Sequence, residues 1–200
     1  MKWFITIVSL DIFIVILYSY LIGSIPTGLI LTQIFLKKDI RKFGSGNIGA
    51  TNVLRTGKKS LAFTTLLIDI FKGYSSIFIS SIYFNDLVIL AGLICFLGHI
   101  FPVWLKFKGG KGIATYVGIL LGLSIELFLV FGFLWLVFLF LFRYSSLSSI
   151  TGSLLTLIYS INLGSIETVF LCFFFFIIII FTHKENIVRL KNKKETKIKF

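Results

Sequence analysis

The chain has 200 residues, of which 57% are hydrophobic, and its 20 Lys and Arg against 8 Asp and Glu give a formal net charge of +12. So apolar a chain has too little polar surface to cover a soluble globule, which excludes a soluble nucleic-acid-binding module as the reason for the basic charge. A helix needs roughly 20 apolar residues to cross a hydrocarbon core of about 30 Å, so a few spans use nearly all of residues 1–200 and leave a single membrane domain.

Seven apolar segments predict an all-α protein, a polytopic transmembrane helical bundle of about seven spans. They cover residues 3–23 with an extension to 36, 60–82, 87–105, 112–123, 126–142, 146–162 and 167–182. The first run lacks a small-residue cleavage site and contains Asp11, so we interpret it as a retained span. As one helix, residues 113–142 would be about 45 Å long, which predicts a break near 122–126. Without a crossing at that break, the count falls to five.

Apart from Lys2 and Lys72, the basic residues lie in alternate connections between the segments and in the carboxyl-terminal tail. They are Lys37, Lys38, Arg41, Lys42, Arg55, Lys58, Lys59, Lys106, Lys108, Lys111, Arg143 and seven Lys or Arg after His183. The opposite connections hold Asp86, Glu126 and Glu167 without any Lys or Arg. Positive loops stay in the cytoplasm, so this asymmetry predicts an outside amino end, a cytoplasmic carboxyl end and basic loops on the cytoplasmic face of the cell membrane.

The first basic loop combines glycines with hydroxyl, amide and guanidinium side chains. These residues are Ser45, Gly46, Asn47, Gly49, Thr51, Asn52 and Arg55. Small residues let backbone amides approach an anion, and Arg55 can bind two phosphate oxygens at once. The pattern favours a phosphate site, and the alternative is a glycine-rich turn between two spans.

The third loop contains Gly109, Gly110, Lys111 and Gly112 and ends where a helix is expected to begin, with Thr115 in its first turn. Amides at a helix start carry a partial positive charge, so Lys111 between glycines predicts a second anion site. A Walker A nucleotide loop is excluded, because Leu105 stands where its first glycine should be and Gly112 replaces its Ser or Thr.

The end of the last span offers a third polar group. On a helix that continues past it, His183, Asn186 and Arg189 share one face. His183 is a candidate proton acceptor near pH 7, and its alternative role is an interfacial histidine that fixes topology.

Charged and reactive residues inside the spans are interpreted as structural. Asp69 and Lys72 are spaced i, i+3, which predicts an ion pair facing the bundle interior. For His99, a structural hydrogen bond is at least as good an interpretation as catalysis. Cys95 and Cys172 lie in apolar runs and act as small hydrophobes.

Taken together, six motifs in chain order resemble the bacterial family of acyl-phosphate-dependent glycerol-3-phosphate acyltransferases. They are residues 23–26 with Gly28; 45–52 with Arg55; Asp69, Lys72 and Gly73; 99–102 with Phe107 and 109–115; Arg143, Tyr144, Ser146, Leu147 and Ser149; and His183, Glu185, Asn186, Arg189, Leu190 and Glu195. The chain departs from the family at Lys193, where a glycine usually precedes the position of Glu195.

The resemblance implies that an acyl phosphate donates its acyl group to the 1-hydroxyl of glycerol 3-phosphate, giving lysophosphatidic acid and phosphate. Lys111, His183 and Asn186 are then the expected catalytic residues. The expected phosphate-binding residues are Ser45, Gly46, Asn47, Gly49, Thr51, Asn52, Arg55, Gly109, Gly110, Gly112, Thr115, Ser146, Ser149 and Arg189. No cofactor, metal or nucleic acid is expected. The protein is expected to be a monomer and is a candidate for functional association with the enzyme that forms acyl phosphate.

Two alternatives stay open. Either His183 takes the hydroxyl proton, or the departing phosphate takes it. A small transporter for anionic solutes would also need glycine breaks and buried charge, but its polar groups should meet near the bilayer midplane rather than at the inner face. The signature of acyltransferases that use acyl-CoA, a His followed five residues later by Asp, is absent, since His99 leads to Trp104 and His183 to Val188.

Overall fold

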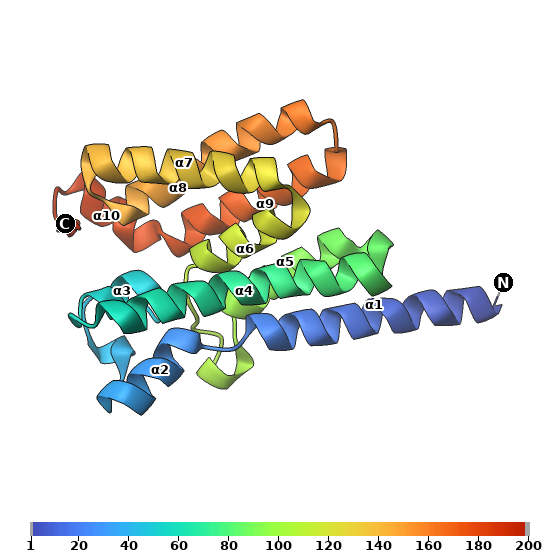
Figure 1. The fold of residues 1–200 in the computed structure, drawn as a ribbon, viewed down its shortest axis with the longest axis horizontal. Helices are drawn as coiled ribbons and strands as arrows, with labels where there is room; N and C mark the ends of the chain where they lie inside the picture. Colours follow the sequence, from blue (N-terminus) through green and yellow to red (C-terminus); the bar gives the residue numbers. More distant parts are fainter. Residues whose placement is uncertain (1, 199–200) are drawn as a thin grey trace. The chain divides into compact units, whose positions relative to one another are not determined.

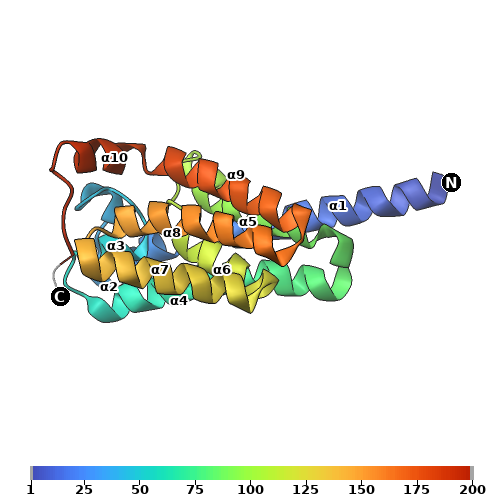
Figure 2. The ribbon, with the colours of Figure 1, turned by 90° about the horizontal axis from the view of Figure 1, so that it is seen from above.

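The computed structural model describes residues 2–198, and every regular element among them is helical (Figure 1; Figure 2). The all-α prediction is therefore confirmed. The chain divides into two compact units, Met1–Gly122 and Leu123–Phe200, called unit 1 and unit 2 below.

Unit 1 is built on three long helices that pack side by side. Its elements are α1 (Lys2–Gly23), α2 (Thr27–Leu36), η1 (Ile40–Lys42), α3 (Ala50–Leu54), α4 (Lys59–Tyr83), η2 (Asn85–Leu87), α5 (Val88–Ile100), η3 (Val103–Leu105) and α6 (Ile113–Leu123). Helices α1 and α5 both pack against α4, and α2 and α3 lie at the end where α4 begins (Figure 1). That end therefore gathers the first basic loop around the start of α4.

Unit 2 is a three-helix layer with a short helix at one end. Its elements are α7 (Ile125–Phe142), α8 (Ser145–Ser160), η4 (Ile161–Leu163), α9 (Ile166–Thr182) and α10 (Lys184–Lys191). Helix α8 packs against both α7 and α9, and α10 contacts α8 and α9 (Figure 2). Small buried residues such as Gly152, Ser153 and Thr156 let the neighbouring helices approach α8 closely.

The expected extension of the first span to residue 36 is a separate helix, because the chain breaks at residues 24–26. The Lys72 ammonium donates to the Ile25 carbonyl over 3.0 Å, and the Trp104 indole donates to the Ser24 carbonyl and hydroxyl oxygens over 3.1 and 2.8 Å. Backbone groups freed by a helix break at membrane depth need such partners. The break is thus a defined feature of unit 1.

Helices occupy all seven predicted segments, but not all of them have the length of a membrane crossing. Among the described residues, five stretches are long and apolar enough to cross, and α9 with α10 makes a sixth. Helix α6 has 11 residues and is about 16 Å long, well short of a hydrocarbon core of about 30 Å. The predicted break near 122–126 is confirmed at Ser124, whose hydroxyl caps α7 by accepting from the Leu127 amide.

Short helix α6 is held in unit 1 by glycine contacts. A Cβ at Gly118 would overlap the Ile70 carbonyl, and one at Gly73 would overlap the Thr115 carbonyl. Helices α4 and α6 therefore touch backbone to backbone, which fixes where α6 begins.

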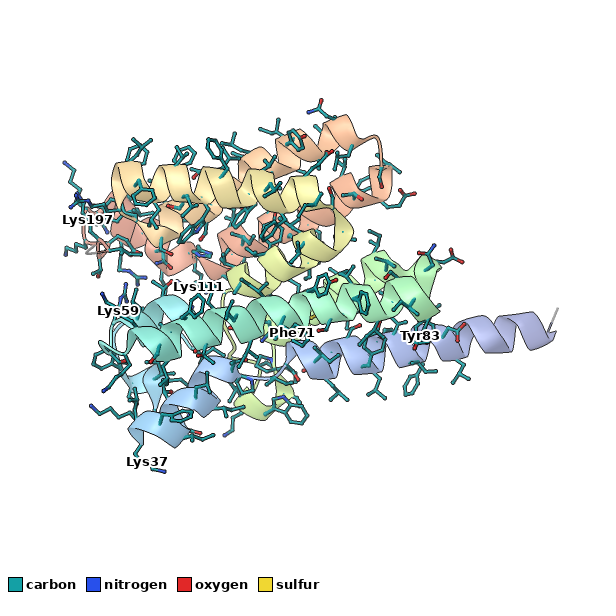
Figure 3. The ribbon with its side chains drawn as sticks, in the orientation of Figure 1. Lys37, Lys59, Phe71, Tyr83, Lys111 and Lys197 are labelled. Atoms are coloured by element: carbon teal, nitrogen blue, oxygen red, sulfur yellow. The ribbon has the colours of Figure 1, made fainter. Side chains whose placement is uncertain are left out.

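Basic residues gather at one end within each unit. In unit 1, Lys37, Lys59 and Lys111 lie toward the same end, and Tyr83 lies at the other (Figure 3). In unit 2, the Ile198 amide donates to the Arg143 carbonyl over 2.8 Å, which places the basic tail beside the turn between α7 and α8. Lys199, the last basic residue of the predicted tail, lies outside the described residues.

Candidate active site

Asn52 organises the first basic loop from a buried position. Its Nδ2 donates to the carbonyls of Ile40, Phe43 and Asn47 over 3.1, 2.9 and 2.7 Å, and its Oδ1 accepts from the Ser45 amide over 3.0 Å. Because the loop itself engages both ends of the amide, Asn52 serves the predicted phosphate site by shaping it rather than by donating to phosphate.

The loop turns where glycine permits a left-handed backbone, at Gly44 (φ 57°) and Gly46 (φ 73°). Asn47 Oδ1 accepts from the Gly49 amide over 3.0 Å, so Gly49 is also part of the loop's internal bonding. Thr51 and Arg55 are exposed at α3, and Ser45 is partly buried. The side chains of Ser45, Thr51 and Arg55 are the ones left to meet a ligand.

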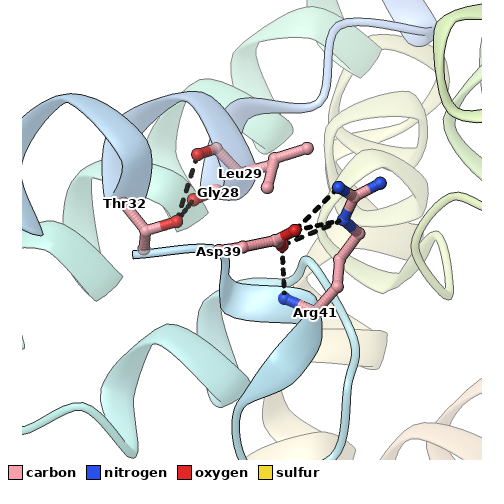
Figure 4. A network of polar contacts seen from close by, with 5 residues as sticks. All are labelled: Gly28, Leu29, Thr32, Asp39 and Arg41. Carbon is pink, nitrogen blue, oxygen red and sulfur yellow. Dashed lines mark hydrogen bonds and ion pairs between the residues drawn. The ribbon is translucent and has the colours of Figure 1, made fainter. Parts of the chain in front are cut away.

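The two arginines of this region have different roles. Arg41 forms a two-pronged ion pair with Asp39, Nε to Oδ1 at 2.9 Å and Nη2 to Oδ2 at 2.7 Å (Figure 4). Figure 4 also shows Thr32, whose hydroxyl donates to the Gly28 carbonyl at 2.8 Å. The hydrogen bond from Arg41 lowers the pKa of Asp39 to about 2. In residues 2–198 no carboxylate pairs with Arg55. Arg55, not Arg41, is therefore available for an external anion.

The third loop is anchored to the end of α5. The Gly109 amide donates to the Ile100 carbonyl over 2.9 Å, and the Gly110 amide donates to the His99 carbonyl over 3.1 Å. These two amides were expected to bind phosphate, and the structure gives them to α5 instead. The two glycines therefore position the loop.

The start of α6 presents the donors that remain. Its first intrahelical bond runs from the Tyr116 amide to the Gly112 carbonyl, so the amides of residues 113–115 have no partner within the helix. The hydroxyl of Thr115 is fully buried and makes no hydrogen bond in the described structure. Partly buried Lys111 precedes this turn by two residues. Cation and helix start together form a candidate anion site in unit 1.

His183 lies between α9 and α10, and the helix expected to continue past the last span bends at this residue. The two helices meet at 61°, although Asn186 and Arg189 still share a face of α10. His183 Nδ1 lies 2.8 Å from the Ile179 carbonyl. A carbonyl only accepts, so the proton is on Nδ1 and the lone pair of the neutral ring is on Nε2. That tautomer suits a proton acceptor.

Glu195 joins three of the expected site residues in unit 2. Its carboxylate accepts from the Ser146 hydroxyl at 2.8 Å, the Asn186 amide at 2.5 Å and Arg189 Nε at 2.7 Å. Glu195 was not among the predicted site residues, and the signal that could have found it is a carboxylate close to the carboxyl end of a tail with seven Lys or Arg. The side chains of Ser146, Asn186 and Arg189 thus converge on one anionic group.

Ser149, expected beside Ser146, takes no part in this cluster. Its hydroxyl donates to the Ser145 carbonyl at 2.8 Å and accepts from the Trp135 indole at 3.1 Å, so it joins α7 to α8.

The contact made by Glu195 should depend on pH. Burial by itself raises the pKa of Glu195, but the hydrogen bonds from Arg189, Asn186 and Ser146 outweigh burial and hold it below its ordinary value. With a lowered pKa in the folded state, the contact is fully present above the ordinary value and is lost as the pH falls through the folded value. We expect the Ile198 amide to be protected from hydrogen exchange at pH 7 and to lose protection in acid, after correction for intrinsic exchange.

Glu195→Gln is the matched variant for that measurement, because it keeps the shape and removes the charge. Its Ile198 amide should exchange faster than in the parent at pH 7 and converge with the parent at the acid end. Equal protection of parent and variant at pH 7 would contradict the assigned role of the carboxylate.

Comparisons with known proteins extend over both units. A family model described as glycerol-3-phosphate acyltransferase matches residues 13–193. A glycerol-3-phosphate acyltransferase of Pelagibacter ubique (strain HTCC1062) is 54% identical over 190 residues, which cover 95% of this chain and 99% of the relative. A glycerol-3-phosphate acyltransferase of Mesorhizobium japonicum is 48% identical over 183 residues, which cover 92% of this chain and 94% of the relative.

Solved structures agree with the sequence relatives. The crystal structure of PlsY, an integral membrane glycerol 3-phosphate acyltransferase, in its glycerol 3-phosphate form has a TM-score of 0.89 and 32% identity, covering 94% of this chain and 96% of that one. Its lysophosphatidic acid form has a TM-score of 0.86. The chain is therefore a multi-pass membrane protein that belongs to the glycerol-3-phosphate acyltransferase family.

Proposed function

We propose that this protein transfers an acyl group from an acyl phosphate to the 1-hydroxyl of glycerol 3-phosphate, releasing lysophosphatidic acid and inorganic phosphate. The family match spans residues 13–193, so the proposal treats both units as one acyltransferase domain. The structures of PlsY in glycerol 3-phosphate and lysophosphatidic acid forms support the acceptor and the product.

The proposal places the reaction at the cytoplasmic face. What supports this is the gathering of basic residues at one end of each unit, since positive loops remain in the cytoplasm. The proposed topology has the amino end outside and the carboxyl end in the cytoplasm, an arrangement that either five or seven passes would give. The protein then acts as a monomer and can receive its donor from the enzyme that forms acyl phosphate.

In the proposed site, two sets of donors bind the two phosphate groups. Arg55, with Ser45 and Thr51, belongs to the loop framed by Asn52 and bounded by Gly46, Asn47 and Gly49. Lys111, with Thr115 and Gly112, belongs to the start of α6, which Gly109 and Gly110 position. Two phosphorylated reactants repel each other when they are brought close together, and fixed cations and amides offset that electrostatic repulsion.

The chemical step is a direct acyl transfer. The 1-hydroxyl oxygen attacks the carbonyl carbon, a new C–O bond forms, and the phosphate leaves with the electrons of the broken C–O bond. Lys111 and Asn186 are the proposed donors to the oxyanion that develops on the carbonyl. The Nδ1 bond to the Ile179 carbonyl supports His183 as the base, acting through Nε2; proton uptake by the departing phosphate is the alternative.

The observation that carries the proposal is the start of α6, where a lysine precedes amides without an intrahelical partner. An activated mixed anhydride needs mainly alignment and anion stabilisation, which such a site supplies. The same residues would be superfluous if the protein only spanned the membrane.

The test uses the purified full chain in lipid nanodiscs with radiolabelled glycerol 3-phosphate. We expect labelled lysophosphatidic acid with palmitoyl phosphate, one inorganic phosphate released per product, and none with palmitoyl-CoA. Turnover with the CoA ester would overturn the donor assignment. Binding of glycerol 3-phosphate without product from either donor would favour the transporter reading.

A further inference from the structure

A buried polar cluster in unit 1, made of Asp69, Lys72 and His99, lies outside the proposed phosphate-binding and catalytic residues. Asp69 and Lys72, spaced i, i+3 on α4, form an ion pair of 2.8 Å with side chains 4% exposed. His99 on α5 is 5% exposed, and its Nδ1 lies 3.9 Å from the same carboxylate oxygen of Asp69. The carboxylate therefore forms an ion pair with the ammonium and faces the Nδ1 edge of the imidazole at a distance longer than a hydrogen bond.

The opposite edge of the imidazole meets the third loop. A Cβ at Gly110 would overlap His99 Nε2 and would lie 2.9 and 3.0 Å from Cε1 and Cδ2, closer than real Cβ contacts. The Gly110 backbone thus rests on the Nε2 edge of the ring. The Gly110 amide also donates to the carbonyl of His99 over 3.1 Å, so one residue of α5 holds Gly110 in two ways.

A second residue of the same helix holds the other side of Lys111. A Cβ at Gly112 (φ 85°) would overlap the ring of Phe96. Phe96 and His99 are spaced i, i+3 on α5 and share a face. Lys111 therefore lies between two glycines that each contact an aromatic ring of α5, Gly110 the ring of His99 and Gly112 the ring of Phe96.

We propose that His99 is a positioning residue for the acyl transfer. The Nε2 edge of its imidazole contacts the Gly110 backbone and so fixes the position of Gly110 and of the neighbouring Lys111. The inference rests on the proposed function, in which Lys111 contacts the reacting group. Lys72 balances the charge of Asp69 within the cluster. His99 touches neither substrate and acts only through the third loop.

The test is a double-mutant cycle between His99 and Gly110 in the full chain. Alone, Gly110→Ala or His99→Ala should lower kcat/KM by about 10- to 100-fold, because displacing a catalytic group by about 1 Å costs rate on that scale. In the His99→Ala background, Gly110→Ala should cost less than about threefold more, since the atoms that its methyl group would overlap are gone. Losses that multiply independently would overturn the inference.

Two glycines provide matched controls. A Cβ at Gly109 would overlap the His99 carbonyl oxygen and would lie 2.5 Å from Pro102 Cδ, atoms that His99→Ala leaves in place. The losses for Gly109→Ala and His99→Ala should therefore multiply. A Cβ at Gly132 would meet nothing within 4 Å, so Gly132→Ala should leave the activity unchanged.

A readout without turnover separates this inference from the proposed function. In nanodiscs, His99→Ala should speed hydrogen exchange in residues 109–115 and leave residues 60–66 of α4 as protected as in the parent. His99→Gln, which returns a side chain of similar reach, should restore most of the protection and the activity. Unchanged exchange in residues 109–115 of His99→Ala would refute the inference. If His99→Ala shows these exchange changes but the parent protein has no transferase activity, only the proposed function is refuted.

Discussion

Replacing Lys111 with alanine should lower turnover with glycerol 3-phosphate and acyl phosphate by about 100- to 1000-fold, the cost of removing one donor to a developing oxyanion. The physical reason is the position of Lys111, two residues before amides that have no partner within α6. The loss should persist at saturating substrate, because the missing interaction is made to the transition state. The measurement is kcat for phosphate release by the purified variant in nanodiscs.

Two variants serve as controls for Lys111→Ala, one at another lysine of the same loop and one that keeps the positive charge at position 111. Lys108→Ala also removes one positive charge, but Lys108 is exposed and outside the proposed site, so its turnover should stay within about twofold of the parent. Lys111→Arg keeps the charge and changes the geometry, and it should recover only part of the activity. Full activity of Lys111→Ala, with normal insertion and melting, would show that the third loop is only a turn.

The segment pattern was sufficient to predict the helices, because apolar length and charge act locally. It also predicted the break near Ser124. The break at residues 24–26 was harder, because it depends on donors from Lys72 and Trp104, which are far along the chain. The number of crossings could not be derived either. Helix α6 is too short to be recognised as a span from its length, and its place in unit 1 depends on close contacts at Gly73 and Gly118.

For the site, sequence reasoning named candidate loops but could not assign the hydrogen-bond partner of each donor in them. The side-chain amide of Asn52 and the backbone amides of Gly109 and Gly110 are donors of the kinds that bind phosphate. In the structure, they donate to neighbouring carbonyls instead. Which of several equivalent amides stays unbonded depends on the fold of the loop, and composition carries no information about it. Glu195 was missed for a similar reason, because its partners Ser146 and Asn186 come from other helices.

The predicted ion pair of Asp69 and Lys72 is confirmed at 2.8 Å, and breaking it should be the most destabilising single change in unit 1. Asp69→Asn leaves the buried Lys72 ammonium without a carboxylate partner, while its hydrogen bond to the Ile25 carbonyl at the α1–α2 break remains. Removing one partner of a buried pair costs about 3–5 kcal/mol. We expect the melting temperature of unit 1 to fall by about 10 °C or more.

The native cysteines allow each unit to be followed separately with a thiol-reactive fluorophore. Cys95 in unit 1 and Cys172 in unit 2 are both buried and free, so each reacts only when its unit opens. In a Cys172→Ala background, Asp69→Asn should lower the temperature at which Cys95 reacts with the fluorophore. In a Cys95→Ala background, the reaction of Cys172 should shift less.

The double variant Asp69→Asn/Lys72→Met distinguishes a broken charge pair from a general packing defect. It removes both charges, and replacing a buried pair by neutral groups of similar size is often close to neutral. Its melting temperature should therefore lie above that of Asp69→Asn alone, although one more residue has been changed. If the double variant melts at or below the single one, the uncompensated ammonium is not the cause, and the cluster around His99 is held by packing rather than by charge.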